Sequence, residues 1–265
     1  MRPFFKLMSI TMQQRMYYRF GFLSSLTTPL ILLTGQLLLW NSIYGLREGQ
    51  ALGTYNRATM FSYILLAFMI NNLLTWSSEN TLSREIRSGS VIARRMRPVS
   101  FLKQTLAEMC GNLLLQGTVN ITLIALAFVV FWRFLTLPSL MNLPLFIISL
   151  LLGILVRMTL VSWFSLLCFF TTGHLGITWT RTALTEFFSG ALVPVALFPS
   201  WLQAFTYWTP FPFMLQAPIA VFLNQPLPMP FWQMAAMQLF WILVFILLHH
   251  LLYGRVRRNT TLAGG

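Results

Sequence analysis

The side chains that could do chemistry in this sequence are few. The chain contains no aspartate and two lysines, and its acids are five glutamates: Glu48, Glu79, Glu85, Glu108 and Glu186. Neither lysine follows a glycine, so the sequence has no phosphate-binding loop that ends in Gly-Lys-Ser/Thr. The three histidines do not stand at metal-ligand spacing with acids. We therefore expect no catalytic residue, no metal site and no cofactor held by this chain.

Three charged residues need a separate explanation because they fall inside apolar runs. Arg157 lies in one run, and Arg181 lies in the next run, about one turn from Glu186. Charges inside a membrane are costly and usually face the helix bundle or a water-filled path. One interpretation is contact with a substrate or a gate. The other is a structural ion pair, or a span boundary that differs from the one drawn below.

The elements that position these charges are apolar helices. Hydrophobic residues make up 57% of the chain and charged residues 9%, whereas soluble domains carry about 25% charged residues. Apolar runs long enough for a bilayer crossing of about 20 residues recur along the sequence. The short alternating segments of a β-barrel are missing. We predict an all-α integral membrane protein, a single transmembrane domain over residues 1–265, with six spans near residues 22–44, 58–76, 106–132, 145–170, 177–195 and 231–253.

Basic residues flank the apolar runs, so the net charge of +13 indicates membrane topology and not nucleic-acid binding. The amino end carries four of the 18 basic residues, the loop before the third span six, and the carboxyl end three. With six spans, all three basic segments fall on one side of the membrane. Because cytoplasmic loops retain Lys and Arg, we predict a multi-pass protein with both termini in the cytoplasm.

Two further segments flank or interrupt the predicted spans. Residues 1–20 mix basic and apolar side chains, which favours an amphipathic helix in the membrane interface, although the segment could instead begin the first span. Residues 194–230 are apolar but repeatedly broken by proline, which removes a helical hydrogen bond. This segment cannot be one continuous span, so we predict short helices that re-enter or lie on the outer leaflet.

Two motifs resemble those of a known family. In the central loop, Glu85 is followed by Gly89-Ser90-Val91 and then by Pro98-Val99-Ser100. The later stretch reads Ser189-Gly190-Ala191-Leu192-Val193-Pro194, then Phe198-Pro199-Ser200-Trp201-Leu202-Gln203, then Thr209-Pro210-Phe211. Their order, spacing and six-span frame resemble the permeases of type-2 ABC exporters across nearly the whole chain.

The resemblance implies roles for both motifs. The loop over residues 79–103 would contain a coupling helix that docks on a separate ABC ATPase subunit, which binds ATP and Mg²⁺. Residues expected to couple to this ATPase are Glu79, Arg84, Glu85, Arg87, Gly89, Arg94, Arg95 and Pro98. The segment after the fifth span would form the outer gate, with Pro194, Phe198, Pro199, Trp201, Pro210 and Phe211. The basic run at residues 93–97 departs from the usually more apolar family pattern, and it is also explained as a positive-inside anchor.

The resemblance also implies partners and a location. A second permease chain, identical or homologous, would complete the path in the plasma (inner) membrane of a bacterium. The aromatic outer segment is consistent with an amphipathic or lipid-like substrate, a peptide or a natural product, although aromatic residues are also ordinary interface anchors. The alternatives are an ATP-independent secondary carrier or channel, which would need ionisable residues along its route, and a membrane scaffold that transports nothing.

Overall fold

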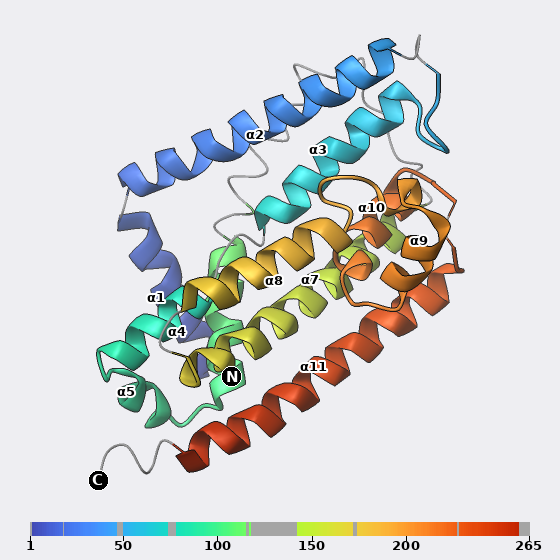
Figure 1. Cartoon of the computed structure of the whole chain (residues 1–265). Helices are drawn as coiled ribbons and strands as arrows, with labels where there is room; N and C mark the ends of the chain where they lie inside the picture. The colour runs from blue at the N-terminus through green and yellow to red at the C-terminus, as the bar shows by residue number, and fades with distance from the viewer. Residues whose placement is uncertain are drawn as a thin grey trace.

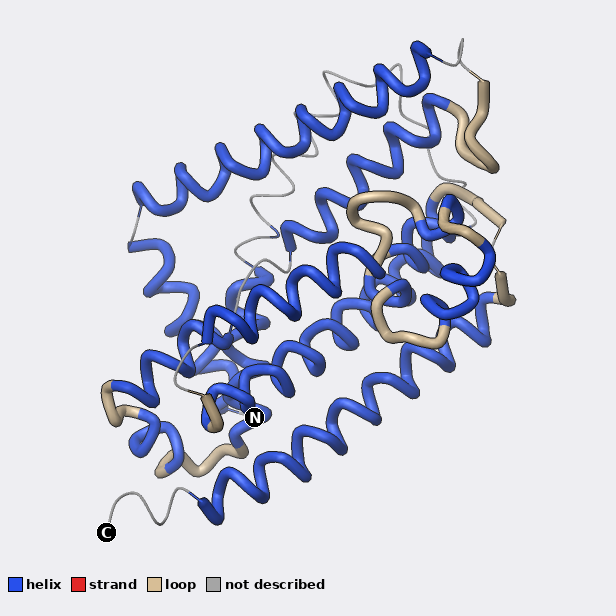
Figure 2. Tube along the Cα trace, in the orientation of Figure 1, coloured by secondary structure: helices blue, strands red, loops and turns tan. Residues whose placement is uncertain are grey.

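The computed structural model describes residues 2–17, 19–46, 50–73, 78–114, 117, 142–171, 174–226 and 228–259. Within these residues the regular elements are all helices, joined by loops and one isolated bridge between Leu52 and Tyr55 (Figure 2). The long helices run side by side, and shorter helices gather at both ends of the bundle (Figure 1). The prediction of an all-α architecture with several long apolar helices is thereby confirmed.

The long helices follow the apolar runs. They are α2 (Arg19–Leu46), α3 (Arg57–Leu73), α7 (Leu143–Leu166), which continues as η3 (Leu167–Phe169), and α11 (Phe231–Asn259). By length and hydropathy, three stretches are long and apolar enough to cross a membrane: Arg57–Arg87, which includes residues outside the described ones, Leu143–Phe169 and Phe231–Arg258. The predicted first and sixth spans lie within α2 and α11, and the fourth lies within α7–η3 except for its last residue. The last residues of the second span and most of the third lie outside the described residues, so the count of six stays a prediction.

The predicted fifth span is wrong at its end. We placed it at residues 177–195, but α8 covers His174–Phe188, which is 15 residues. A helix of this length rises about 22 Å, less than the bilayer core of about 30 Å. The cause lies in the following turn, where Gly190 has φ +88°, a conformation that ends a right-handed helix. The chain then enters the proline-rich segment.

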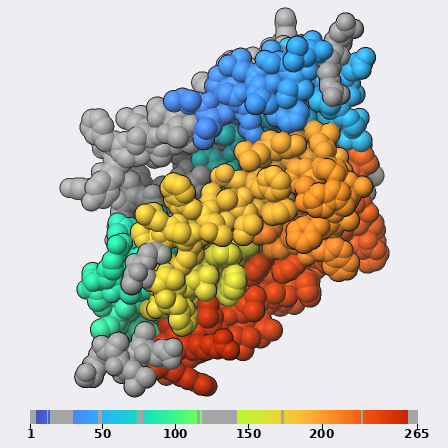
Figure 3. All heavy atoms as spheres, in the orientation of Figure 1, coloured from blue at the N-terminus to red at the C-terminus, as the bar shows by residue number. Residues whose placement is uncertain are grey.

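The proline-rich segment forms four short helices at one end of the bundle, here called the α9–α10 end. They are η4 (Val195–Leu197), α9 (Ser200–Tyr207), η5 (Pro212–Met214) and α10 (Gln216–Phe222). In the space-filling view, the segment lies between α2 and α3 on one side and α11 on the other (Figure 3). Residues 212–221 are all buried, so η5 and α10 belong to the core and α9 covers them.

The opposite end, here called the α4–α5 end, collects the other short helices. It holds α1 (Arg2–Tyr17), α4 (Ser78–Arg87), α5 (Val91–Arg95) and the carboxyl end of α11 (Figure 1). Helical residues 101–114 start here as well. All three basic segments of the sequence therefore lie at one end of the molecule. A Cβ atom on Gly111 would lie 2.7 Å from the Met8 carbonyl oxygen, which places α1 directly against this helix.

A close backbone approach ties α7 to the proline-rich segment. A Cβ atom added at Gly153 of α7 would lie 2.9 Å from the Phe213 carbonyl oxygen and 3.0 Å from that of Met214. Beside this contact, the Gln238 side chain of α11 donates hydrogen bonds to the carbonyl oxygens of Ser149 (2.9 Å) and Phe213 (2.8 Å). Glycine at position 153 therefore allows η5 to rest on the backbone of α7.

The first prediction concerns this contact. Gly153→Ala should lower the free energy of unfolding by about 1–3 kcal/mol, because the new methyl group overpacks against two backbone carbonyls that cannot rotate away. Gly35→Ala on α2 is the matched control, since a Cβ atom there meets nothing within 4 Å. Alanine should be neutral there, or stabilising by up to about 1 kcal/mol through helix propensity. Thermal unfolding in detergent measures both, and equal midpoints would contradict the argument.

Candidate functional site

The α4–α5 hairpin is the most charged part of the fold, and its sequence explains its shape. One face of α4 is buried through Ser78, Glu79, Leu82 and Ser83, while Arg84 and Arg87 are exposed on the other. Leu82 packs with Phe101 and Leu166, so the apolar face is fixed to the bundle. The helix ends in a tight turn at Gly89, whose φ of +72° favours glycine.

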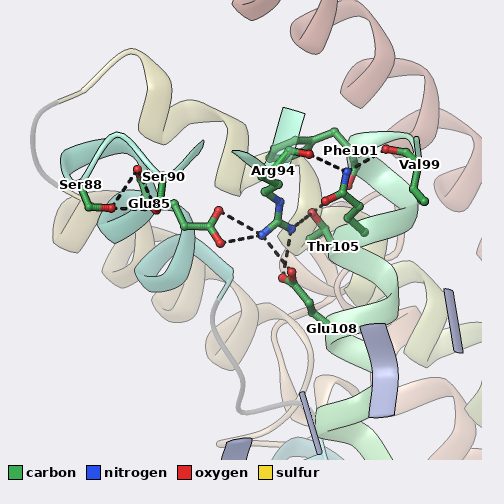
Figure 4. Close-up of polar contacts among 9 residues, drawn as sticks. Glu85, Ser88, Ser90, Arg94, Val99, Phe101, Thr105 and Glu108 are labelled. Carbon is green, nitrogen blue, oxygen red and sulfur yellow. Dashed lines mark hydrogen bonds and ion pairs between the residues drawn. The ribbon is translucent and has the colours of Figure 1, made fainter. Parts of the chain in front are cut away.

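Arg94 of α5 is the centre of a buried ion network (Figure 4). Its side chain is 4% exposed, and its Nη1 atom lies 3.2 Å from the Glu85 carboxylate of α4 and 3.0 Å from that of Glu108. Its Nη2 atom donates to Glu108 Oε2 at 3.0 Å and to Thr105 Oγ1 at 3.1 Å. The guanidinium also lies 4.9 Å from the centre of the Phe101 ring. One cation therefore joins α4, α5 and the helix of residues 101–114.

The loop between α5 and that helix is held by a second contact. Gln104 Nε2 donates to the carbonyl oxygens of Arg94 (3.0 Å) and Val99 (2.8 Å), closing the chain over Pro98. Buried polar groups of this kind are costly unless they are satisfied. Together with the ion network, this contact makes the hairpin and residues 101–114 one packed unit.

The structure revises which predicted coupling residues lie at the surface. Arg84, Arg87, Gly89 and Pro98 are exposed, as a docking surface requires. Glu79 and Arg94 are buried, and the Glu85 side chain is 26% exposed and bound to Arg94. These three cannot act as simple surface contacts, because their charges are used within the fold.

Arg95 is held differently from its neighbour. Its Nη2 atom lies 3.5 Å from the Val256 carbonyl oxygen of α11, and its guanidinium stands 5.6 Å from the centre of the Phe169 ring. It thereby fastens the hairpin to the carboxyl end of α11. The basic run at residues 93–97 therefore contains structural cations as well as the exposed Arg97.

The charges expected within the membrane do not pair as their spacing suggested. Arg181 of α8 bonds through Nε to Glu79 Oε1 of α4 at 2.5 Å, and not to Glu186. The Glu79 side chain is fully buried. Arg157 of α7 donates from Nη1 to Asn71 Oδ1 of α3 at 2.6 Å. Glu186 is half-buried on α8. Glu79, which was expected to couple to the ATPase, therefore pairs with Arg181, which was expected in the path or in an ion pair. The two residues meet because α4 and α8 pack together.

The outer-gate residues form the boundary of the α9–α10 end. Pro194 and Pro210 are buried, Phe198 and Phe211 are half-buried, and Pro199 and Trp201 are exposed, Trp201 to 70%. Phe198 stacks on Phe187 and Phe211 stacks on Phe188, both of α8. The aromatic segment is therefore attached to the carboxyl end of α8, and Trp201 points away from the core.

The turn that starts this segment is held by polar residues that sequence reasoning missed. The Tyr63 hydroxyl lies 2.8 Å from the Gly190 carbonyl oxygen and also contacts Gln216 Oε1. The Val195 amide donates to the same Gln216 oxygen at 3.3 Å. The only signal in the sequence was the presence of isolated polar side chains within apolar runs.

Tyr55, in the loop between α2 and α3, extends this hydrogen-bonded group. Gln216 Nε2 donates to its hydroxyl oxygen at 3.4 Å, and the Tyr44 hydroxyl donates to the Tyr55 carbonyl oxygen at 2.8 Å. Burial raises the pKa of Tyr55 above its usual value, so its phenol stays protonated at neutral pH. The contacts of Tyr44, Tyr55 and Gln216 are therefore between neutral groups.

Comparison with known proteins assigns a family. The model of the family described as "ABC-2 family transporter protein" matches residues 30–264, which is most of the chain. Comparison with curated proteins finds no match.

The second prediction concerns the ion network. Arg94→Gln should destabilise the protein by about 2–3 kcal/mol, because it removes charge-assisted hydrogen bonds and leaves two carboxylates close together. Arg97→Gln, an exposed cation in the same loop, should change stability by less than about 0.5 kcal/mol. Thermal unfolding in detergent compares the two variants. If Arg94→Gln unfolds at the same temperature as Arg97→Gln, the network does not hold this end together.

Proposed function

The chain belongs to the ABC-2 family of transporter proteins, and we propose that it is the membrane-spanning permease subunit of an ATP-driven exporter. It is a multi-pass membrane component of a transporter, and on this proposal ATP hydrolysis belongs to a separate ABC ATPase. The observation that carries the proposal is the α4–α5 hairpin, whose exposed tip is rigidly joined to the bundle. A short, charged hairpin of this kind suits docking and the transmission of movement.

The ion pairs of the α4–α5 hairpin define how movement of the hairpin would reach the helix bundle. A push on the exposed face of α4, at Arg84 and Arg87, passes through Glu85 and Arg94 into residues 101–114. It also passes through Glu79 and Arg181 into α8. Packed elements transmit such displacements because their interiors are dense and resist compression. On this proposal, ATP binding by the ATPase shifts the permease helices from one conformation to another. It does so because the ATP-bound ATPase has unequal affinities for the two conformations.

The proposed translocation path lies between two permease chains, along their first, second and fifth spans. Large apolar side chains on α2 and α8 are exposed in the single chain: Ile31, Leu32, Leu38, Leu39, Leu175, Trp179, Leu184 and Phe187. Exposed apolar faces of this size mark contact with lipid, with a second chain or with an apolar substrate. Together with the aromatic α9–α10 end, they support an amphipathic or lipid-like substrate. The protein would lie in the bacterial inner membrane with the α4–α5 end in the cytoplasm.

The third prediction tests the partnership. When the tagged chain is purified from its own membranes in mild detergent, mass spectrometry should find a stoichiometric ATPase with a phosphate-binding loop. Any second permease in the complex would show whether the pair is identical or homologous. A chain that is purified alone, or transport that continues after the ATPase is deleted, would contradict the proposal and favour a carrier or a scaffold.

The fourth prediction places the docking surface. Arg87→Glu should lower the transport-coupled ATP hydrolysis of the purified complex several-fold, because it reverses an exposed charge on the docking face of α4 without breaking a buried bond. Arg57→Glu makes the same change at the opposite end of the bundle and should leave this hydrolysis unchanged. Equal activity of the two variants, with both folded, would mean that ATPase docking does not involve this face of α4.

A further inference from the structure

Three of the four described acids are already paired with other cations. Glu85 and Glu108 bind Arg94, and Glu79 binds Arg181. Glu48 falls outside the described residues, and Asn71, the partner of Arg157, belongs to the last turn of α3. Among the described acids, Glu186 is therefore the one without an ion pair.

Arg157 itself is buried and incompletely bonded. The residue is 8% exposed. Nη1 donates to Asn71 at 2.6 Å, but within the described residues Nε is buried without a hydrogen-bond partner. Asparagine supplies one acceptor and no charge. A cation kept inside an apolar bundle without a bonded counter-ion is costly, and intramembrane charges of this kind mark functional sites, substrate and ion pathways among them.

Charged side chains of α8 and α4 contribute to the electrostatic environment of Arg157. Arg181 and Glu186 are five residues apart on α8, about 7 Å along the helix axis. Both act electrostatically on Arg157, as does Glu79. The charge of Arg181 is already matched by Glu79 at 2.5 Å. Glu186 is half-buried and makes no ion pair within 4 Å in the described part of the chain. Arg157 is thus subject to the charges of one completed pair and of one carboxylate that makes no ion pair among the described residues.

We propose that Arg157 binds the anionic group of the exported molecule, and that Glu186 competes with this group for the guanidinium. The inference rests on the proposed function and narrows its substrate to amphiphiles that carry a carboxylate or phosphate. Asn71 occupies Nη1, whereas Nε is buried without a partner among the described residues and can donate to an oxygen of such a group. Asn71 orients the guanidinium, and Glu186 supplies the counter-charge when the site is empty.

The test uses the complex with its ATPase in phosphatidylcholine nanodiscs, which offer no competing anionic lipid. The probes share one alkyl chain and differ in charge: dodecyl phosphate, dodecyl maltoside and dodecyltrimethylammonium. Equilibrium binding should be tightest for dodecyl phosphate. Arg157→Gln should weaken that binding at least tenfold and leave the neutral probe unchanged. Glu186→Gln should strengthen it several-fold, because the competing carboxylate is gone. Arg257→Gln, which removes an exposed cation at the end of α11, is the matched control and should bind as the wild type.

The two substitutions are expected to change the affinity for dodecyl phosphate in opposite directions, which distinguishes an anion site from a structural role. A merely structural role would weaken binding in both variants, and for all three probes alike, which would overturn the inference. If Arg157→Gln does not fold, tighter binding of dodecyl phosphate by Glu186→Gln still supports the site, and unchanged binding overturns it. Trapping the complex with ATP and vanadate should release the bound probe. Retention would mean a resident lipid or ion and would overturn the transport role.

Failure of the proposed function would have a different signature. It would appear as a purified chain with no ATPase and no ATP hydrolysis. Failure of the inference would appear in a complex that hydrolyses ATP but binds dodecyl phosphate independently of Arg157.

Discussion

The architecture depends on the cost of placing charge inside an apolar bundle. Each buried cation must find an acceptor, and the chain has five acids to offer. The structure uses two of them on Arg94 and one on Arg181. Both cations lie where separate helices meet, so each ion pair does more than cancel charge. It fixes the position of α4 relative to the helices that follow it.

The two ends of the bundle are held by different chemistry. At the α4–α5 end, ion pairs of 2.5–3.2 Å join α4 to α5, α5 to residues 101–114, and α4 to α8. At the α9–α10 end, the contacts of Tyr63, Gln216 and Gln238 are between neutral groups. Hydrogen bonds to charged groups contribute roughly twice as much as neutral ones. The end at which we propose that the ATPase docks is therefore the one held by the stronger polar contacts.

Periodicity and composition predicted the helices well, because an apolar run or a proline determines the backbone conformation of the residues around it. The all-helical architecture and the break-up of residues 194–230 followed from such local rules. The end of α8 did not, since the turn at Gly190 depends on Tyr63 and Gln216, which are distant in sequence. The pairing of Arg181 was also missed. Spacing along one helix pointed to Glu186, but only tertiary packing brings Glu79 of α4 within 2.5 Å.

The pairing of Glu79 with Arg181 changes how coupling and transport relate to each other. Glu79 begins α4, directly behind the exposed face that we assign to docking, and Arg181 lies on α8 beside Arg157. A shift of α4 must either carry Arg181 with it or break a buried ion pair, and breaking such a pair costs about 3–5 kcal/mol. Carrying it along moves α8, and with it Glu186, relative to Arg157. Movement at the docking face and the electrostatic environment of the proposed anion site are thereby linked through one carboxylate.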